Sequence, residues 1–335
     1  MTEPLLKVEN LSVIFDVRPQ GAWPWTKPMK LHAASNVSFE LAPGETLGLV
    51  GESGSGKSTI ARAIIDTVPA SKGAILWRGE DMTSFPPARR RDHRRHVQMV
   101  FQDPLASLDP RMKVGEIIAE PLITHEPQTA KAEVKRKVGE LMERVGLLPN
   151  QINRYPHEFS GGQCQRIGIA RALILEPDLV ICDEPVSALD VSVQAQVINL
   201  LSDLQRDMGL AMIFIAHDLS VVRHISDRIL VLYLGRVMEL AEAEELISRP
   251  VHPYTQSLIS SVPIPDPVVE RNRPRPVLEG DLPSPLDPPS GCVFRTRCGL
   301  ADASCANARP EMIELSPGHV AACPKISQAE VSSAV

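Results

Sequence analysis

The chain has 335 residues, enough for one large domain with an appendage or for two domains, and its 43% apolar content allows a full core without disulfides. The net charge of −6 argues against a dedicated nucleic-acid binder, and the 4% aromatic content argues against surfaces that stack bases. No apolar run approaches the roughly 18–20 residues of a membrane-spanning helix, and the N-terminus lacks a signal-peptide pattern. We therefore expect a cytosolic chain whose membrane role, if any, goes through a partner.

The N-terminal region predicts two strands separated by an irregular excursion. Residues 5–17 and residues 31–41 both alternate loosely between apolar and polar types. The segment between them places Trp23 and Trp25 among prolines, which indicates a loop. Phe15 is either a core aromatic at a strand end, as its spacing favours, or a platform for an adenine ring. The two tryptophans are rival candidates for that stacking role.

A phosphate-binding loop follows the next predicted strand. Residues 46–50 are mostly apolar, residues 51–59 match G-x-x-x-x-G-K-[ST], and residues 59–65 predict the start of a helix. Glycines allow the tight backbone path, successive N–H groups cradle phosphate oxygens, and the helix adds its positive N-terminal end. In this pattern Lys57 reaches the β- and γ-phosphates, and the Ser58 hydroxyl holds Mg²⁺. The candidate nucleotide-binding residues here are Gly51, Glu52, Ser53, Gly54, Ser55, Gly56, Lys57, Ser58 and Thr59.

The next stretch predicts a hairpin, a charged helix and a strand. Residues 73–81 form the hairpin, and the basic run at 89–96 indicates a solvated helix face rather than a nucleic-acid patch. Residues 97–101 predict a strand that ends at Gln102.

Two helices are predicted in the middle of the chain. Residues 130–148 carry one apolar stripe, so we expect a helix that Pro149 ends. A second helix covers residues 164–175, with Ser160 placed to cap it and the following glycines exposing N–H groups as a second anion site. This candidate site comprises Ser160, Gly161, Gly162 and Gln163.

An apolar strand that begins at Leu179 ends in two carboxylates. Asp183 is placed for a water-mediated hold on Mg²⁺. Glu184, expected on the other side of the pleat, is placed as the base that polarises an attacking water. An ordinary acidic turn is the alternative, which the phosphate loop earlier in the chain makes improbable.

Another buried strand, predicted over residues 211–216, is followed directly by His217. A lone histidine at a strand end is more often structural than catalytic. This strand is the next one along the chain after the strand that ends in Asp183 and Glu184. The position of His217 at its end therefore favours a contact with the γ-phosphate. A last hairpin over 228–240 and a short helix over 242–249 complete this part of the chain.

The composition then shifts towards proline. Residues 250–290 predict an extended segment that wraps a surface rather than a second globular core. Near its start, a short helix that ends at Val262 is predicted. Cys164 and Cys182 fall in a helix and a strand, so both are interpreted as packing residues.

Four further cysteines lie in the tail with the spacing C-x5-C-x6-C-x17-C. In a reducing cytosol this clustering suggests a metal rather than disulfides. A [4Fe–4S] cluster and tetrahedral zinc both suit four thiolates, and the lack of a C-x2-C pair favours iron–sulfur. Free thiols are the alternative. The candidate ligands are Cys292, Cys298, Cys305 and Cys323.

The order of these motifs resembles that of one known family. The phosphate loop, Gln102, S-G-G-Q at 160–163, Asp183–Glu184, S-A-L-D at 187–190 and His217 are together similar to the ATP-binding subunit of an ABC transporter. In the tail, H-P-Y-T at 252–255 and G-C-V-F-R-T-R-C at 291–298 look like the C-terminal extension of oligopeptide and dipeptide importer ATPases. The run at 101–111 and the Trp-containing excursion look most like the F-type subunit of oligopeptide importers.

The resemblance implies a fold class and a division into domains. It implies an α/β fold, an ABC-type P-loop nucleotide-binding domain with a RecA-like core, an antiparallel β subdomain and a helical subdomain over residues 1–248. A Pro-rich, Cys-containing C-terminal extension over residues 249–335 would follow.

The resemblance also implies roles. It gives Gln102 a sensor role for Mg²⁺ and γ-phosphate, residues 160–163 the signature motif, and Asp183 and Glu184 the metal and catalytic carboxylates. Asp190 would be the aspartate of the loop between the two ATPases, His217 the switch histidine, and Phe15 the adenine-stacking aromatic. ATP, Mg²⁺ and a [4Fe–4S] cluster on the four tail cysteines are the implied cofactors.

An importer subunit of this kind hydrolyses ATP to power oligopeptide or dipeptide uptake at the cytoplasmic face of the inner membrane. The implied partners are a D-type ATPase in a heterodimer, two transmembrane permeases and an extracytoplasmic peptide-binding protein, with no nucleic acid. Three alternatives remain. One is a soluble ABC ATPase of DNA repair or translation, although the chain has neither a second cassette nor a coiled-coil insertion. Another is a regulatory subunit whose tail senses redox state. The third is a small-molecule P-loop kinase, which would need neither S-G-G-Q nor His217.

Overall fold

The computed structural model describes residues 3–18, 21, 23, 25–262, 271 and 280–326. A smaller antiparallel sheet has the strand order β2-β1-β4-β5. Its strands are β1 (Leu6–Val17), β2 (Met29–Leu41), β4 (Lys72–Trp77) and β5 (Glu80–Asp81). These elements agree with the predicted N-terminal strands and hairpin.

A larger mixed sheet has the order β11-β12-β10-β9-β3-β8-β7-β6. Its parallel strands are β3 (Thr46–Val50), β6 (Val97–Val100), β7 (Leu179–Asp183), β8 (Ala211–Ile215) and β9 (Arg228–Tyr233). The antiparallel strands β10 (Arg236–Glu242), β11 (Ile313–Ser316) and β12 (His319–Ala321) extend it on one side.

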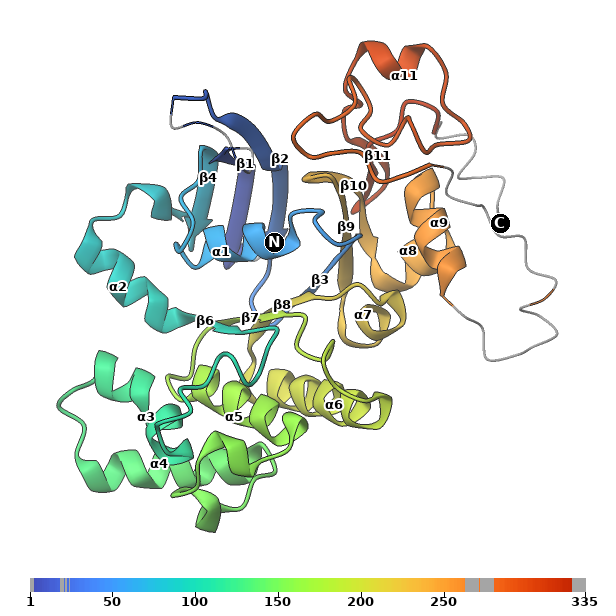
Figure 1. Cartoon of the computed structure of the whole chain (residues 1–335). Helices are drawn as coiled ribbons and strands as arrows, with labels where there is room; N and C mark the ends of the chain where they lie inside the picture. Colours follow the sequence, from blue (N-terminus) through green and yellow to red (C-terminus); the bar gives the residue numbers. More distant parts are fainter. Residues whose placement is uncertain are drawn as a thin grey trace.

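Helices surround the larger sheet. They are α1 (Lys57–Ile64), α2 (Pro87–His96), α3 (Val114–His125), α4 (Lys131–Arg144), α5 (Gly161–Leu173), α6 (Val191–Met208), α7 (Leu219–Ile225), α8 (Ala243–Ser248), α9 (Pro253–Ser261) and α11 (Ser304–Asn307). Short 3-10 turns cover Met82–Ser84, Pro149–Gln151 and Pro156–Glu158. Figure 1 shows the smaller sheet with α1 and α2, the helices α3 to α6, and the C-terminal elements as three groups around the central strands.

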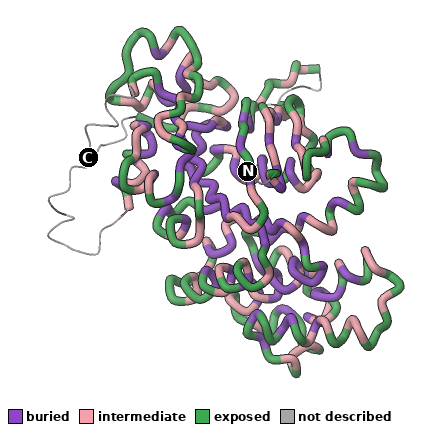
Figure 2. The backbone as a smooth tube through the Cα atoms, turned by 180° about the vertical axis from the view of Figure 1, so that it is seen from behind, coloured by how far each residue is buried: buried purple, intermediate pink, exposed green. Residues whose placement is uncertain are grey.

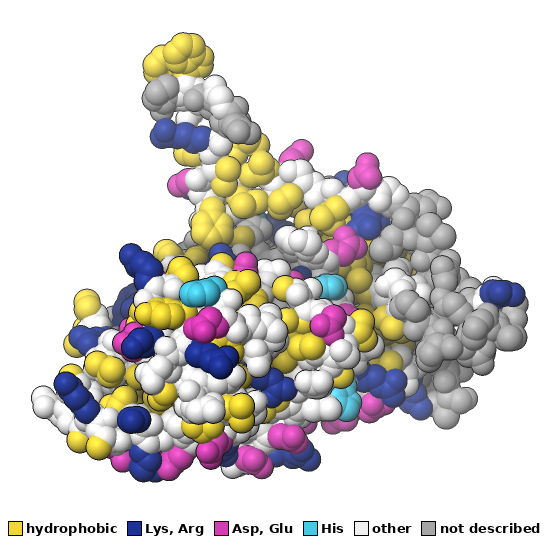
Figure 3. All heavy atoms as spheres, turned by 60° about the horizontal axis from the view of Figure 1, so that its bottom comes forward, with side chains coloured by type: hydrophobic (Ala, Val, Ile, Leu, Met, Phe, Trp, Pro, Cys, Tyr) yellow, Lys and Arg dark blue, Asp and Glu magenta, His cyan; other side chains and the backbone are white. Residues whose placement is uncertain are grey.

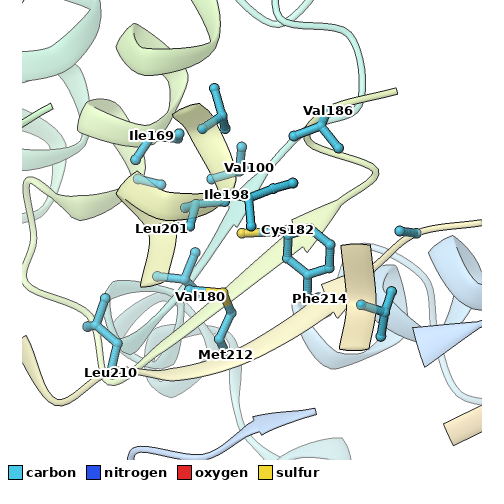
Figure 4. Packing of buried hydrophobic residues seen from close by; sticks show 14 of the residues in the cluster. Val100, Ile169, Val180, Cys182, Val186, Ile198, Leu201, Leu210, Met212 and Phe214 are labelled. Carbon is cyan, nitrogen blue, oxygen red and sulfur yellow. The ribbon is translucent and has the colours of Figure 1, made fainter. Parts of the chain in front are cut away.

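The central strands are buried on both faces, as expected for parallel strands covered from both sides. Along β7, Val180 and Cys182 join the cluster that packs on α5 and α6 (Figure 4). Leu179 and Ile181 point the other way and join the cluster made with α1 and the smaller sheet. In Figure 2 the buried residues run through the centre of the molecule. This covering holds the strand ends that carry the candidate site in place.

One predicted helix boundary is wrong. The helix predicted over 130–148 ends at Arg144 rather than at Pro149, because Gly146 adopts φ +76°. The Gly146 N–H donates to Glu143 O at 2.9 Å and the Leu147 N–H to Met142 O at 2.8 Å, which is the Schellman pattern of a helix end. Pro149 starts a separate 3-10 turn.

The tail differs from the prediction in being part of the main sheet. Strand β12 pairs with β10, with Glu239 opposite Ala321, and the Ala322 N–H donates to Met238 O at 2.8 Å. Pairing of this kind depends on partners some 80 positions away, which no local pattern reveals. Helix α9 confirms the predicted short helix, while residues 263–270 and 272–279 of the proline-rich segment lie outside the described residues.

The basic run forms α2, but its face is not wholly solvated. His93 is 5% exposed and packs edge-on against Trp77, with ring centroids 5.0 Å apart, and this burial lowers its pKa to about 4. The arginines of this helix pair with nearby carboxylates such as Asp66 and Glu126. On the face seen in Figure 3, basic and acidic side chains are interspersed.

Trp23 and Trp25 stack on each other with centroids 4.9 Å apart and remain 67% and 77% exposed. Across the described ranges, no helix is both long enough and apolar enough to cross a membrane.

Candidate functional site

Four neighbouring parallel strands end at one edge of the larger sheet. Strand β3 leads into the phosphate loop, β6 is followed by Gln102, β7 ends in Asp183 and Glu184, and β8 is followed by His217. The carboxyl ends of parallel strands meet at the same edge, which is where α/β proteins bind ligands. The fold therefore gathers residues that are up to 166 positions apart in the chain, from Gly51 to His217.

The phosphate loop takes a path that requires glycine. Gly51, Gly54 and Gly56 have φ of +149°, +78° and +100°. At Gly56 a Cβ would lie 2.2 Å from the carbonyl oxygen of Ala33 in β2, so the loop rests directly on the smaller sheet. Helix α1 begins immediately afterwards at Lys57, with its N-terminal end facing the loop.

Lys57 lies across the loop rather than in solvent. Its Nζ donates to Gly51 O at 2.7 Å and to Glu52 O at 3.0 Å, and the side chain is 4% exposed. Burial lowers the pKa of Lys57, although the nearby carboxylates of Glu184, Asp183 and Glu52 oppose the shift. An incoming phosphate would therefore replace two neutral carbonyl partners with a charged one.

Ser58 and Asp183 face each other from α1 and β7. The Ser58 hydroxyl donates to Asp183 Oδ1 at 2.8 Å, and Asp183 is 3% exposed. Burial raises the pKa of Asp183, and the hydrogen bond from Ser58 works against that rise. Among the described residues, no cationic side chain donates a hydrogen bond to this carboxylate. A hydroxyl beside such a buried carboxylate is a set of oxygen ligands that fits a hard cation such as Mg²⁺.

Glu184 is joined to residues from the two flanking strands. Its Oε2 accepts from Gln102 Nε2 at 2.9 Å and lies 3.8 Å from His217 Nδ1. Strand β7 ends at Asp183, and Glu184 itself adopts φ +45°, so its side chain is not oriented by the pleat of the strand. A left-handed conformation at a non-glycine residue carries strain, which is common where a side chain is held for function.

The segment 160–163 and Asp190 lie at helix starts in another part of the fold. The Ser160 hydroxyl and the Gln163 side chain cap α5 reciprocally, and Asp190 caps α6 by accepting from Val193 N at 3.1 Å. A Cβ at Gly162 would lie 2.4 Å from Val193 Cγ1, so the two helix starts pack closely. Between the described residues, no hydrogen bond or ion pair joins segment 160–163 to the phosphate loop.

Phe15 is half-buried in β1, opposite Leu31 of β2, and packs at the margin of the smaller-sheet cluster. The structure thus places it beside the core as well as near the N-terminal excursion. Cys164 and Cys182 are fully buried, which confirms the prediction that they are packing residues.

The four tail cysteines belong to one lobe formed by residues 291–325. The Cys292 N–H donates to Cys305 O at 2.8 Å, and the four sulfurs are free thiols. Burial raises the pKa of Cys323, and the other three cysteines add to that rise, so the thiols lie within electrostatic reach of one another. In the described ranges, however, no group of three or more His, Cys, Asp or Glu side chains could hold a metal ion.

Two residues that contact the phosphate loop carry no role in the sequence interpretation. The Tyr254 hydroxyl and the Arg297 guanidinium both reach Glu52, from α9 and from the cysteine lobe. The sequence offers a weak signal for both residues. Tyr254 is one of only 3 tyrosines in the whole chain, and Arg297 directly precedes Cys298 in the run R-T-R-C. Only tertiary structure shows where these side chains point.

Two family models match the chain. The ABC transporter family matches residues 34–187, and the C-terminal region of the oligopeptide/dipeptide transporter family matches residues 238–305. The first match covers the loop, Gln102 and both carboxylates of the β7 end. The second covers α9 and the first three of the four tail cysteines.

Several curated proteins are similar over almost the whole chain. The oligopeptide transport ATP-binding protein OppF of Haemophilus influenzae is 60% identical, over 97% of this chain and 98% of that protein. OppF of Salmonella typhimurium is 59% identical, over 96% of both chains. A putative peptide import ATP-binding protein of Brucella ovis is 52% identical, over 96% of this chain and 98% of that one.

Solved structures agree on the fold. A dimeric ATP-binding cassette in a post-hydrolysis state, bound to ADP and Pi, is 26% identical with a TM-score of 0.63, over 71% of this chain and 98% of that chain. A cassette from a Clostridium perfringens ABC transporter complex has the same TM-score of 0.63 at 24% identity, over 74% of this chain and 92% of that one. The similarity to these curated proteins over almost the full length shows that the chain belongs to the ATP-binding proteins of the ABC transporter family, in the oligopeptide/dipeptide transporter group.

Proposed function

We propose that this chain is the ATP-hydrolysing subunit of an importer that powers uptake of oligopeptides across the cytoplasmic membrane. One observation supports the proposal most directly: three groups meet at one edge of the larger sheet. They are the phosphate loop, the hydrogen-bonded pair of a hydroxyl and a carboxylate, and a glutamate that contacts both a side-chain amide and an imidazole. The residues concerned are Lys57, Ser58, Gln102, Asp183, Glu184 and His217.

Binding of ATP uses the loop and the start of α1. The N–H groups of the loop donate to the phosphate oxygens, and the positive end of the helix attracts the negative charge of the phosphates. Lys57 then moves its hydrogen bonds from the carbonyls of Gly51 and Glu52 to the β- and γ-phosphate oxygens. Ser58 and Asp183 would hold Mg²⁺, with Gln102 nearby, and the ion would supply charge stabilisation to the transferring phosphoryl group.

Hydrolysis is in-line attack of water on the γ-phosphate. Glu184 accepts a hydrogen bond from that water and orients it, while Gln102 and His217 fix the position of the Glu184 carboxylate. We infer that His217 also donates to the γ-phosphate, which is the role that the resemblance gives it. Catalysis of this kind is mostly positioning and electrostatic stabilisation, so the strained backbone of Glu184 has a clear use.

The second half of the nucleotide site comes from a partner ATPase. Ser160, Gly161, Gly162 and Gln163 lie at an exposed helix start away from the phosphate loop of the same chain, and Asp190 lies beside them. We infer that they face the nucleotide of a D-type partner, as in a closed pair with two ATP molecules. The solved cassette bound to ADP and Pi, a dimer, supports this arrangement.

The remaining partners follow from the relatives. The OppF proteins are named for oligopeptide transport, so we propose two permeases and an extracytoplasmic peptide-binding protein as partners, with the chain peripheral at the cytoplasmic face. We further propose that residues 1–248 form the nucleotide-binding domain, with Phe15 as the adenine platform, and residues 249–335 the importer-type extension. Its sheet pairing with β10 makes the extension integral to the domain.

For the four tail cysteines we propose a [4Fe–4S] cluster. The proposal rests on the resemblance of the tail to importer extensions and on the place of the four thiols in one lobe, where the other three cysteines add to the raised pKa of Cys323. Protein purified without oxygen should contain iron and sulfide and should absorb visible light as iron–sulfur clusters do. The Cys305→Ser variant should lose the bound iron and sulfide and this absorption. Protein with zinc or with no metal would refute the cluster.

Glu184→Gln tests the hydrolytic role. Removing the carboxylate while keeping the shape should lower the ATPase rate of the chain, assembled with its partners, by about 10²–10⁴-fold, with ATP binding retained. Lys57→Ala should instead weaken ATP binding itself. Normal turnover by Glu184→Gln would remove this residue from its role, and unchanged affinity in Lys57→Ala would refute the nucleotide site.

A further inference from the structure

Two side chains of the C-terminal region contact one residue of the phosphate loop. The Glu52 N–H donates to the Tyr254 hydroxyl at 3.0 Å. The Arg297 Nη1 donates to Oε1 and to Oε2 of Glu52, each at 2.9 Å. Glu52 is thus held by its amide and by its carboxylate, while its carbonyl accepts from Lys57 at 3.0 Å. Every polar group of this loop residue has a partner.

The ion pair is largely shielded from water. The Arg297 side chain is 9% exposed and the Glu52 side chain 24%. The guanidinium also lies 5.9 Å from the ring centroid of Tyr233, whose hydroxyl is 3.5 Å from Nη1. Shielding strengthens an ion pair relative to one in water, so this contact holds more firmly than an exposed salt bridge.

The cysteine lobe sets the position of Arg297. The Arg297 N–H donates to Phe294 O at 2.9 Å in a tight turn that directly precedes Cys298. Phe294 is 2% exposed, and its ring lies 5.3 Å from those of both Tyr233 and Tyr254. One aromatic cluster therefore joins β9, α9 and the lobe, and both Glu52 partners are attached to it (Figure 1 shows these elements side by side).

The position of Arg297 leaves one of its buried donors without a hydrogen bond. The Nε of Arg297 is buried and has no hydrogen-bond partner among the described residues. An unsatisfied buried donor is unfavourable, and the two bonds from Nη1 to the Glu52 carboxylate offset that cost.

We propose that Arg297 and Tyr254 are positioning residues that hold the phosphate loop, through Glu52, in the form that binds ATP. The C-terminal region then contributes directly to nucleotide affinity, and a change in the fold of the cysteine lobe is transmitted to the loop through Arg297. This inference rests on the proposed function, since it requires ATP at the loop.

A double-mutant cycle on ATP affinity tests the pair in the full-length chain. Arg297→Gln and Glu52→Gln should each weaken ATP binding roughly fivefold or more. The double variant should bind no more weakly than the worse single one, because residues in one network are not additive. Arg295→Gln is the matched control, since this arginine lies in the same turn but bonds to Ser290. It should leave ATP affinity unchanged.

Tyr254→Phe gives a second measurement if Arg297→Gln does not fold. It removes one oxygen atom, keeps the buried ring, and leaves the Glu52 N–H without its acceptor, so it should also weaken ATP binding. Additive losses in the cycle, or wild-type affinity in folded Arg297→Gln and Tyr254→Phe, would overturn the inference. Lys57→Ala separates the two levels: loss of binding there with no effect of Arg297→Gln refutes the positioning role alone.

Discussion

Gly56 and Gly54 lie two positions apart in the phosphate loop, and both have a left-handed φ, of +100° and +78°. Their surroundings differ. A Cβ at Gly56 would lie 2.2 Å from Ala33 O, whereas a Cβ at Gly54 would have no heavy atom within 4 Å. The pair therefore separates backbone strain from steric contact within a single loop.

The magnitudes follow from these two conditions. Gly54→Ala should cost about 1–2 kcal/mol of unfolding free energy, which is the penalty of a left-handed L-residue. Gly56→Ala should add the cost of forcing backbone apart, typically about 1–3 kcal/mol for overpacking. The neighbouring atoms belong to the Ala33 main chain in β2, so no flexible side chain can move aside.

Urea unfolding of the nucleotide-free chain measures both variants against the wild type. We expect Gly56→Ala to be the less stable by about 1–3 kcal/mol, the overpacking difference. Its ATP affinity should also fall further than that of Gly54→Ala, because the start of α1 is displaced. Equal loss of stability in the two variants would show that the loop does not rest on β2 as described, and would refute the reasoning.

Three further predictions concern buried polar groups. Asp183→Asn should leave the unliganded chain as stable as the wild type or more so, since burial already disfavours the carboxylate, yet Mg²⁺ should no longer tighten ATP binding in titrations with and without the ion. Gln102→Ala should slow hydrolysis while changing ATP affinity little, because it frees the Glu184 carboxylate, and an unchanged rate in steady-state assays would contradict this. For His319, 1% exposed, burial lowers the pKa but its bonds to Glu239 and Glu245 outweigh that and leave the pKa raised. A raised folded-state pKa gives stability that is present below the unfolded pKa of about 6.5 and lost as pH rises through the folded value, so His319→Gln should cost more unfolding free energy at pH 6 than at pH 9.

Much of the candidate site was predictable because local chemistry marks it. The loop at 51–59 has glycines and a lysine at the fixed spacing that a phosphate loop requires. Two carboxylates directly after an apolar strand, in a chain with such a loop, indicate a functional site. The sequence predicts that Gln102, Asp183 and His217 each lie at the end of a strand, and the structure shows that these strands are parallel neighbours, so the three residues meet at one edge of the sheet. The structure adds the contacts, such as the 2.9 Å bond from Gln102 to Glu184.

Other features lay beyond local patterns. The end of α4 at Arg144 depends on Gly146, which the nearby proline obscured. At Glu184 the backbone departs from the strand conformation, with φ +45°, although its N–H still donates to Ile215 O at 3.0 Å in the neighbouring strand. Both features lie where a single residue adopts a positive φ.

The amino-acid sequence by itself was enough to name the candidates for the chemistry: the residues proposed to bind phosphate, the two carboxylates after an apolar strand, and the order of motifs that marks the family. These depend on residue type and short spacing, which are written along the chain. Only the tertiary structure decided that the tail joins the main sheet through β12 and that Arg297 and Tyr254 reach Glu52, 245 and 202 positions away. Such contacts arise from the packing of distant elements around a shared core, and their partners are set by three-dimensional shape rather than by spacing.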